Sequence, residues 1–245
     1  MLRGLLREVS DIRTDLTAAQ RTSIERLARP GMWWTGAERV AIAAEARAAR
    51  ACGLCRDRKQ ALSPYGSPGE HAATPLLAAP YVDAVHRIVT DPGRLTLAWL
   101  DGLRDEGLED GPYIELVGIV ATTLAVDTFR RVLGMPLPDL PEPQSGEPSR
   151  EGPAVAARPG TAWVPLVDPR EGLSEVYDDN PIAPYVRQAL SLAPDEMRNL
   201  IEMEITHYLP LEAMRRPGDA AGRAIDRSQL ELLAARVSYL NGCFY

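Results

Sequence analysis

Residues 35–59 read TGAERVAIAAEARAARACGLCRDRK. The Ala-rich first part predicts a helix that runs to about residue 51, with Thr35 as its cap and Glu38 completing a capping box. Cys52 and Cys55 come directly after it. If Cys52 opens a new helix, both thiols lie on one face with Cβ atoms about 5–6 Å apart. A modest adjustment of that spacing permits a disulfide, so the stretch indicates redox chemistry.

The charge around the thiols favours the same interpretation. A thiol in the first turn of a helix lies at the positive end of the helix dipole, and Arg56, Arg58 and Lys59 follow within one turn. Both features favour thiolate. The alternative is two cysteines used as small apolar residues. A zinc half-site is less favoured, because only one further cysteine, Cys243, and three histidines are present.

Composition limits the class of protein. The chain has 245 residues, of which 45% are hydrophobic and only 6% aromatic, and this favours close-packed helices over a β-sandwich. The net charge of −7, without a basic stripe, makes nucleic acid an improbable partner. We expect no membrane span, because no apolar run approaches about 18 residues. An early charge at Arg3 argues against a signal peptide, and an odd number of cysteines indicates reduced thiols, so we expect a cytoplasmic protein.

Apolar periodicity predicts helices throughout the chain. The segment from Pro136 to Pro169 interrupts this pattern and holds nine of the 21 prolines, as in an extended linker whose apolar end, 163–167, docks on a folded surface. In the last helix, Ser228 is the expected cap. The expected helices cover residues 2–28, 35–51, 80–89, 94–106, 112–133, 182–192, 194–208 and 226–240.

The two halves look like imperfect copies, since Glu38 precedes Cys52 much as Glu231 precedes Cys243. The stretch 229–243 resembles the core of the AhpD-like alkylhydroperoxidase family, within the carboxymuconolactone decarboxylase superfamily. That family's motif is a glutamate, eleven residues, Cys-x-x-Cys, three residues and a histidine, and Glu231 and Cys243 match its first spacing. Three first-half segments resemble the family's region downstream of the cysteines: 103–108, 113–117 and 133–137.

The resemblance implies an all-α fold of two AhpD-like helical repeats. The corresponding divisions are an N-terminal helix at 1–32, a first repeat at 33–138, a Pro-rich linker at 139–162 and an incomplete second repeat at 163–245. It also implies a homo-oligomer without a cofactor that reduces hydroperoxides and is restored by a dithiol protein or small thiol. If the roles of the family's two cysteines are transferred to this chain, Cys55 is the attacking thiol, which becomes a sulfenic acid, and Cys52 is the resolving thiol. Spacing alone leaves the order of the two cysteines open.

The first half departs from the family motif at two positions. Lys59 stands at the histidine position, and Val40 stands at the glutamate position. Glu45 and Lys59 lie seven residues either side of Cys52, so a reversal of the chain there would let them face each other. We therefore predict that a Glu45–Lys59 pair replaces the family's carboxylate–imidazole relay. The alternative is two solvated charges.

The second half departs at its end, because the sequence stops one residue before the partner of Cys243 is due. Related chains that this one resembles sometimes carry selenocysteine there, so we expect the natural chain to continue with selenocysteine or cysteine. The enzyme would then be thiol-dependent or selenol-dependent.

Two other functions fit the same sequence. One is a decarboxylase-like member that uses the helical pocket without redox chemistry, and the other is a non-catalytic assembly module. The decarboxylase-like enzyme requires acid–base groups, but His71 falls in a predicted loop, while His86 and His207 fall in apolar helices. Histidines in such helices are more often packing residues than catalysts. The peroxidase is therefore the preferred interpretation.

Overall fold

The computed structural model describes residues 12–160, 162–180 and 183–242. Over these residues the fold is all-α, as predicted, and the only strand-like pairing is an isolated bridge between residues 158 and 166. Short 3-10 turns occur at 26–28, 64–66 and 92–94. The α-helices of the described residues are α1 Thr14–Glu25, α2 Gly36–Ala49, α3 Gly53–Gln60, α4 Ala79–Thr90, α5 Leu97–Asp105, α6 Asp110–Val132, α7 Tyr185–Gln188, α8 Pro194–His207, α9 Leu211–Met214 and α10 Arg227–Leu240.

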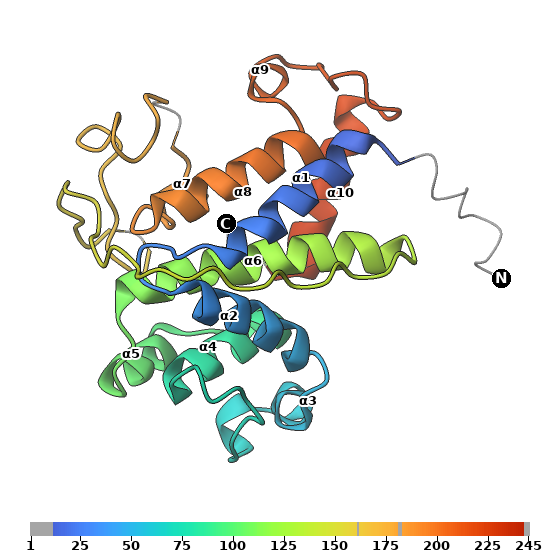
Figure 1. The fold of residues 1–245 in the computed structure, drawn as a ribbon. Coiled ribbons are helices and arrows are strands. Elements are labelled where there is room, and N and C mark those ends of the chain that lie inside the picture. The colour runs from blue at the N-terminus through green and yellow to red at the C-terminus, as the bar shows by residue number, and fades with distance from the viewer. Residues whose placement is uncertain (1–11, 161, 181–182, 243–245) are drawn as a thin grey trace, which may run out of the picture.

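Helix α6 is the central element of the fold (Figure 1). Helices α1 and α8 pack against one side of it, and α2 and α4 pack against the other. Its inner side chains, such as Leu116 and Ile119, are fully buried. By length and composition α6 is apolar enough to cross a membrane, contrary to the sequence-based expectation, but 61% of its apolar window is buried inside the protein. It therefore has the burial of a core helix.

Local signals set the boundaries of α2 and α3. The Thr35 hydroxyl accepts a hydrogen bond from the Glu38 N–H, and the Glu38 carboxylate accepts one from the Thr35 N–H at 2.8 Å. This confirms the predicted capping box. Helix α2 ends at Ala49, and Cys52 is the N-cap of α3, so the predicted new helix also forms.

Three helix predictions need correction. Helix α10 is capped by Asp226, whose carboxylate accepts the Gln229 N–H at 2.8 Å, and not by Ser228. A carboxylate there also interacts favourably with the helix dipole, which explains its advantage over the hydroxyl. The short helix α9 was not expected, and α7 is a single turn. The part of the first predicted helix before residue 12 lies outside the described residues.

The predicted linker follows the surface of the helices. Its backbone donates hydrogen bonds from Gln144 to Ala28 O at 2.8 Å and from Arg150 to Met32 O at 2.6 Å. The apolar end of the proline-rich segment is buried at Val167, which is 0% exposed. This burial confirms that the 163–167 patch docks on the folded body.

A buried ionic cluster joins α2, α6 and α8. The Arg39 guanidinium contacts Glu115 and lies 2.6 Å from a Glu196 carboxylate oxygen. All three side chains are at most 6% exposed. Gly118 lets α8 approach α6, because a Cβ at this position would lie 2.4 Å from the Cβ of Glu196. One cation thus compensates two carboxylates that water does not solvate.

Replacing Arg39 with methionine should lower the free energy of unfolding by about 3–5 kcal/mol, because two buried carboxylates would lose their cation. Urea denaturation measures this difference. The matched control is Arg21→Met, which removes an exposed ion pair with Glu25 and should change stability by less than about 0.5 kcal/mol. Equal effects of the two variants would contradict the role assigned to the cluster.

Candidate active site

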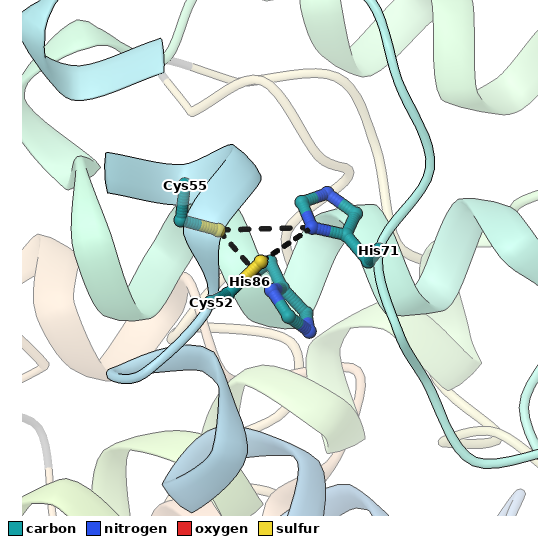
Figure 2. A group of neighbouring side chains, drawn as sticks. All are labelled: Cys52, Cys55, His71 and His86. Atoms are coloured by element: carbon teal, nitrogen blue, oxygen red, sulfur yellow. Dashed lines mark hydrogen bonds between the residues drawn. The ribbon is translucent and has the colours of Figure 1, made fainter. Parts of the chain in front are cut away.

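Helix α3 brings both thiols of the Cys-x-x-Cys pair into one small volume (Figure 2). Cys52 is at the N-cap and Cys55 lies in the first turn. The Cys55 side chain is buried, at 3% exposed, while Cys52 is partly exposed. The two sulfur atoms lie within 4.8 Å of each other. Both are free thiols, and a small side-chain movement would bring them to disulfide distance.

Two histidines lie against these sulfur atoms (Figure 2). His86, on α4, places its Nδ1 atom 3.1 Å from the Cys55 sulfur. His71, on the segment before α4, places its Nδ1 atom 3.4 Å from the Cys52 sulfur and 3.7 Å from the Cys55 sulfur. The centroids of the two imidazole rings are 3.9 Å apart. Each thiol therefore has an imidazole nitrogen within reach of its proton.

Glu45 fixes the orientation of His86. This carboxylate, on α2, is only 3% exposed. One oxygen accepts a hydrogen bond from His86 Nε2 at 2.7 Å, and the other accepts the Thr74 N–H at 3.0 Å. Because Nε2 carries the proton that Glu45 accepts, the Nδ1 lone pair of a neutral ring faces the Cys55 thiol. Glu45, His86 and Cys55 therefore form a proton relay.

Asp83 holds the second imidazole in the same way. Its carboxylate accepts from His71 Nε2 at 3.1 Å and from the Arg58 guanidinium at 2.7 Å. The Trp99 indole N–H donates to its other oxygen at 2.8 Å. Burial raises the pKa of Asp83, but these three donors outweigh burial and hold the pKa well below its usual range. Asp83 is thus an anion that stabilises the His71 imidazolium.

The same contacts change the acidity of the site. Burial raises the pKa of the Cys55 thiol, but hydrogen bonds with His71, His86 and Thr90 outweigh it and lower the pKa to about 6. Burial lowers the pKa of His71, while its bonds to Asp83 and to the cysteines raise it to about 10. At neutral pH the site therefore contains a thiolate beside an imidazolium.

The reactivity of Cys55 should follow this lowered pKa. In the reduced protein, with chelator present, alkylation of Cys55 by iodoacetamide should accelerate through pH 6 and level off above pH 7, since the thiolate is then about 90% formed. His86→Gln should move the inflection upward, because the hydrogen bond that stabilises the thiolate is lost. Lys59→Ala keeps both histidines and is the matched control. Mass spectrometry of the alkylated peptide measures the rate, and an inflection above pH 8 in the parent protein would contradict this assignment.

A cavity of about 360 Å³ opens onto the thiols. Cys52 and Cys55 form part of its wall, and Val89 and Thr90 at the end of α4 form another part. Three cations also line it: Arg50, Arg56 and Lys59. The cavity therefore gives a small substrate access to the residues of the Cys-x-x-Cys pair.

The structure corrects the predicted relay. The Glu45 carboxylate is bonded to His86 and to the Thr74 backbone, and no ion pair between Glu45 and Lys59 exists among the described residues. The prediction of a Glu45–Lys59 pair is therefore wrong. His86 is buried on an apolar helix and both of its ring nitrogens have polar partners, one of which is the Cys55 sulfur, while His71 lies outside the helices, as predicted. The signal that could have identified them is that two of only three histidines follow the Cys-x-x-Cys pair closely.

Of the predicted second-half site residues, the structure describes Glu231, whose contacts lie outside this cluster. Glu231 is on α10, where its carboxylate accepts a hydrogen bond from Arg227 at 2.6 Å. Cys243 lies outside the described residues. Among the described residues, the structure therefore brings together Cys52, Cys55 and Glu45 of the predicted site and adds His71, His86 and Asp83.

Comparison of the chain with protein-family models, with curated proteins and with solved structures finds no match. The chemistry of the site itself is therefore what indicates a function. A buried thiol with an adjacent base and a second thiol within reach can act as a nucleophile and then form a disulfide. The same two sulfurs and two imidazole nitrogens are also the atoms that could hold a metal ion.

Proposed function

We propose that this protein is a thiol-dependent peroxidase that reduces hydroperoxides through the Cys52–Cys55 pair. The observation that carries the proposal is the contact between the Cys55 sulfur and His86 Nδ1 at 3.1 Å, with Glu45 behind the imidazole and Cys52 within disulfide reach. A nucleophile, a base and a group that orients the base are the parts that activation of a thiol requires.

In the first step, His86 Nδ1 takes the Cys55 proton, and Glu45 stabilises the imidazolium that forms. The thiolate attacks the terminal oxygen of the hydroperoxide, and the O–O bond breaks. The departing alkoxide receives the proton from the imidazolium and leaves as an alcohol. Cys55 becomes a sulfenic acid, so two electrons have moved from sulfur to the peroxide.

In the second step, the Cys52 sulfur attacks the sulfenic acid of Cys55. A disulfide forms and water is released. His71, whose Nδ1 atom is 3.4 Å from the Cys52 sulfur, stabilises the attacking thiolate. A dithiol protein or a small thiol then donates two electrons and restores both thiols. The partial exposure of Cys52 supports this role, because a reductant attacks the accessible sulfur.

The proposal includes the wider expectations from the AhpD-like resemblance. They are two helical repeats, a cytoplasmic location, and assembly into a homo-oligomer. Exposed apolar side chains on α10 support assembly, since Leu232 and Tyr239 are 70% and 75% exposed. Light scattering of the purified protein measures the oligomeric state.

The direct test is consumption of hydrogen peroxide and cumene hydroperoxide by the chelator-treated protein with dithiothreitol as reductant. The proposal predicts turnover that requires both Cys52 and Cys55. Consumption that survives in the Cys55→Ser variant would exclude the proposed mechanism.

A further inference from the structure

Four donor atoms of the site are arranged around one point. The sulfurs of Cys52 and Cys55 and the Nδ1 atoms of His71 and His86 all lie within 4.8 Å of one another (Figure 2). They come from the start of α3, from the segment before α4, and from α4 itself. With one further cysteine and three histidines, the sequence favours a zinc site less than redox chemistry, but the fold brings two of those histidines to the thiols.

The distances between these atoms match the edges of a tetrahedral zinc site. With Zn–S near 2.3 Å and Zn–N near 2.0–2.1 Å, tetrahedral geometry gives sulfur–nitrogen edges of about 3.6 Å. Three of the four sulfur–nitrogen distances in the protein are 3.1 Å for Cys55 with His86, 3.4 Å for Cys52 with His71 and 3.7 Å for Cys55 with His71, and the remaining pairs of donor atoms lie within 4.8 Å. A cation could enter with shifts of a few tenths of an ångström.

The groups behind the imidazoles also suit a metal site. Histidine ligands commonly donate their second ring N–H to a carboxylate, which fixes the tautomer and raises the basicity of the ligating nitrogen. His86 bonds to Glu45 in this way at 2.7 Å, and His71 bonds to Asp83 at 3.1 Å. Both rings therefore turn Nδ1 toward the sulfurs. Two thiolates and two imidazoles in a tetrahedron are a donor set typical of zinc.

The geometry points to a second function of this pocket, in which the reduced protein binds one Zn²⁺ through Cys52, Cys55, His71 and His86. Binding displaces the protons still carried by the two thiols. All four positions around the ion would be filled by protein atoms, which is the pattern of a closed site. Metal binding itself does not depend on the proposed peroxidase activity. Its consequence for activity does, because a sulfur held by zinc is not free to attack a peroxide.

Zinc would therefore protect the reduced pair and compete with the peroxidase reaction. A hydroperoxide that oxidises the zinc-bound pair takes two electrons from the two thiolates and two protons from the acid form of the buffer. The products are the Cys52–Cys55 disulfide, an alcohol, water and free Zn²⁺. One zinc ion should thus be released for each disulfide formed.

Cobalt titration tests the site without reference to catalysis. Reduced, chelator-treated protein is titrated anaerobically with Co²⁺, which reports its ligands by absorption. The expected result is one ion bound, with a thiolate-to-cobalt charge-transfer band and the intense visible bands of tetrahedral cobalt, and displacement of Co²⁺ by Zn²⁺. Binding without a charge-transfer band, or more than one equivalent with equal affinity, would overturn the inference.

Variants assign the ligands. Cys52→Ser and His71→Gln should each weaken binding and change the cobalt spectrum, and Asp83→Asn should lower the affinity about 10- to 100-fold while keeping both thiolate ligands. The matched control replaces the remaining histidine, His207→Gln, whose ring lies against Phe129 and Gln20, and it should bind as the parent does. Loss of binding in this control, or binding retained in the Cys52→Ser/Cys55→Ser double variant, would refute the assignment.

A separate measurement links the metal to the peroxidase. Stoichiometric Zn²⁺ should suppress hydroperoxide consumption, and chelator should restore it. If cobalt binds as expected but the chelator-treated protein consumes no peroxide, the proposed function fails and the metal site stands. If peroxide is consumed but no thiolate-ligated cobalt forms, the metal site fails and the proposed function stands.

Discussion

Replacing Cys55 with serine should lower the rate of hydroperoxide consumption by about 10³-fold or more, because the attacking sulfur is removed. A serine hydroxyl at this position is a far weaker nucleophile toward a peroxide oxygen. The measurement stops the reaction at fixed times, with dithiothreitol as reductant, and determines the peroxide that remains. The control is His207→Gln, which changes a side chain that lies against Phe129 and Gln20, away from the thiols, and it should leave the rate unchanged.

Cys52→Ser separates the two thiols. This variant should consume one equivalent of peroxide, accumulate the Cys55 sulfenic acid, and form no internal disulfide. A dimedone label on Cys55, found in this variant and absent from Cys55→Ser, would identify the attacking sulfur. If the label instead appeared on Cys52 in the Cys55→Ser variant, the order of the two cysteines would be the reverse of the one proposed.

Replacing His86 with glutamine should lower the second-order rate of oxidation by about 10²- to 10⁴-fold, the usual contribution of a positioned general base. Glutamine keeps most of the side-chain volume and can still bond to Glu45, so the fold should persist. The rate is measured by following Cys55 oxidation under stoichiometric peroxide. Part of the loss should disappear as the pH is raised, because the thiol then ionises without help from the histidine, while the part due to the missing proton donor to the alkoxide should remain.

The matched control for this variant is His207→Gln, which changes the histidine on α8. His207 lies against Phe129 and 3.4 Å from Gln20, away from the thiols. The His207→Gln substitution should therefore leave the oxidation rate unchanged. A large loss in this control, or no pH-dependent recovery in His86→Gln, would argue against the relay and for a general effect on folding.

Local features of the fold could be predicted from the sequence. The Thr35 and Glu38 pair lies within one turn, so its capping box depends on neighbouring residues alone. The Cys-x-x-Cys spacing similarly places both thiols at the start of α3. The cap of α10 is harder to predict, because Asp226 and Ser228 are both suitable and lie two residues apart. In the structure Asp226 is the cap.

The polar partners of the thiols could not be predicted in the same way. His71 and His86 lie 16 and 31 residues after Cys55, and no local period connects them. His86 reaches Cys55 because α4 packs against both α2 and α3, and His71 is held beside the thiols by its hydrogen bond to Asp83 of α4. Glu45 was identified as a site residue, but its partner depends on this packing and turned out to be His86. The cations of α3 were expected to stabilise the thiolate, whereas the histidines have the larger effect.

The site also shows why one cluster can suggest two chemistries. A thiolate beside an imidazole that a carboxylate orients is suited to nucleophilic attack. Two such pairs facing one another are suited to a soft cation. If both proposals hold, the balance between them depends on whether Cys52 and Cys55 are reduced and on how much zinc is present.

The most direct test of the central claim is a peptide measurement after a single turnover. Reduced, chelator-treated protein receives one equivalent of hydrogen peroxide, is blocked with iodoacetamide and is digested with trypsin. Cleavage after Arg50 and Arg56 releases both thiols in one peptide, Ala51–Arg56. The account predicts that this peptide loses two hydrogen atoms and carries no alkyl group. Recovery of a doubly alkylated peptide after the peroxide has been consumed would contradict it.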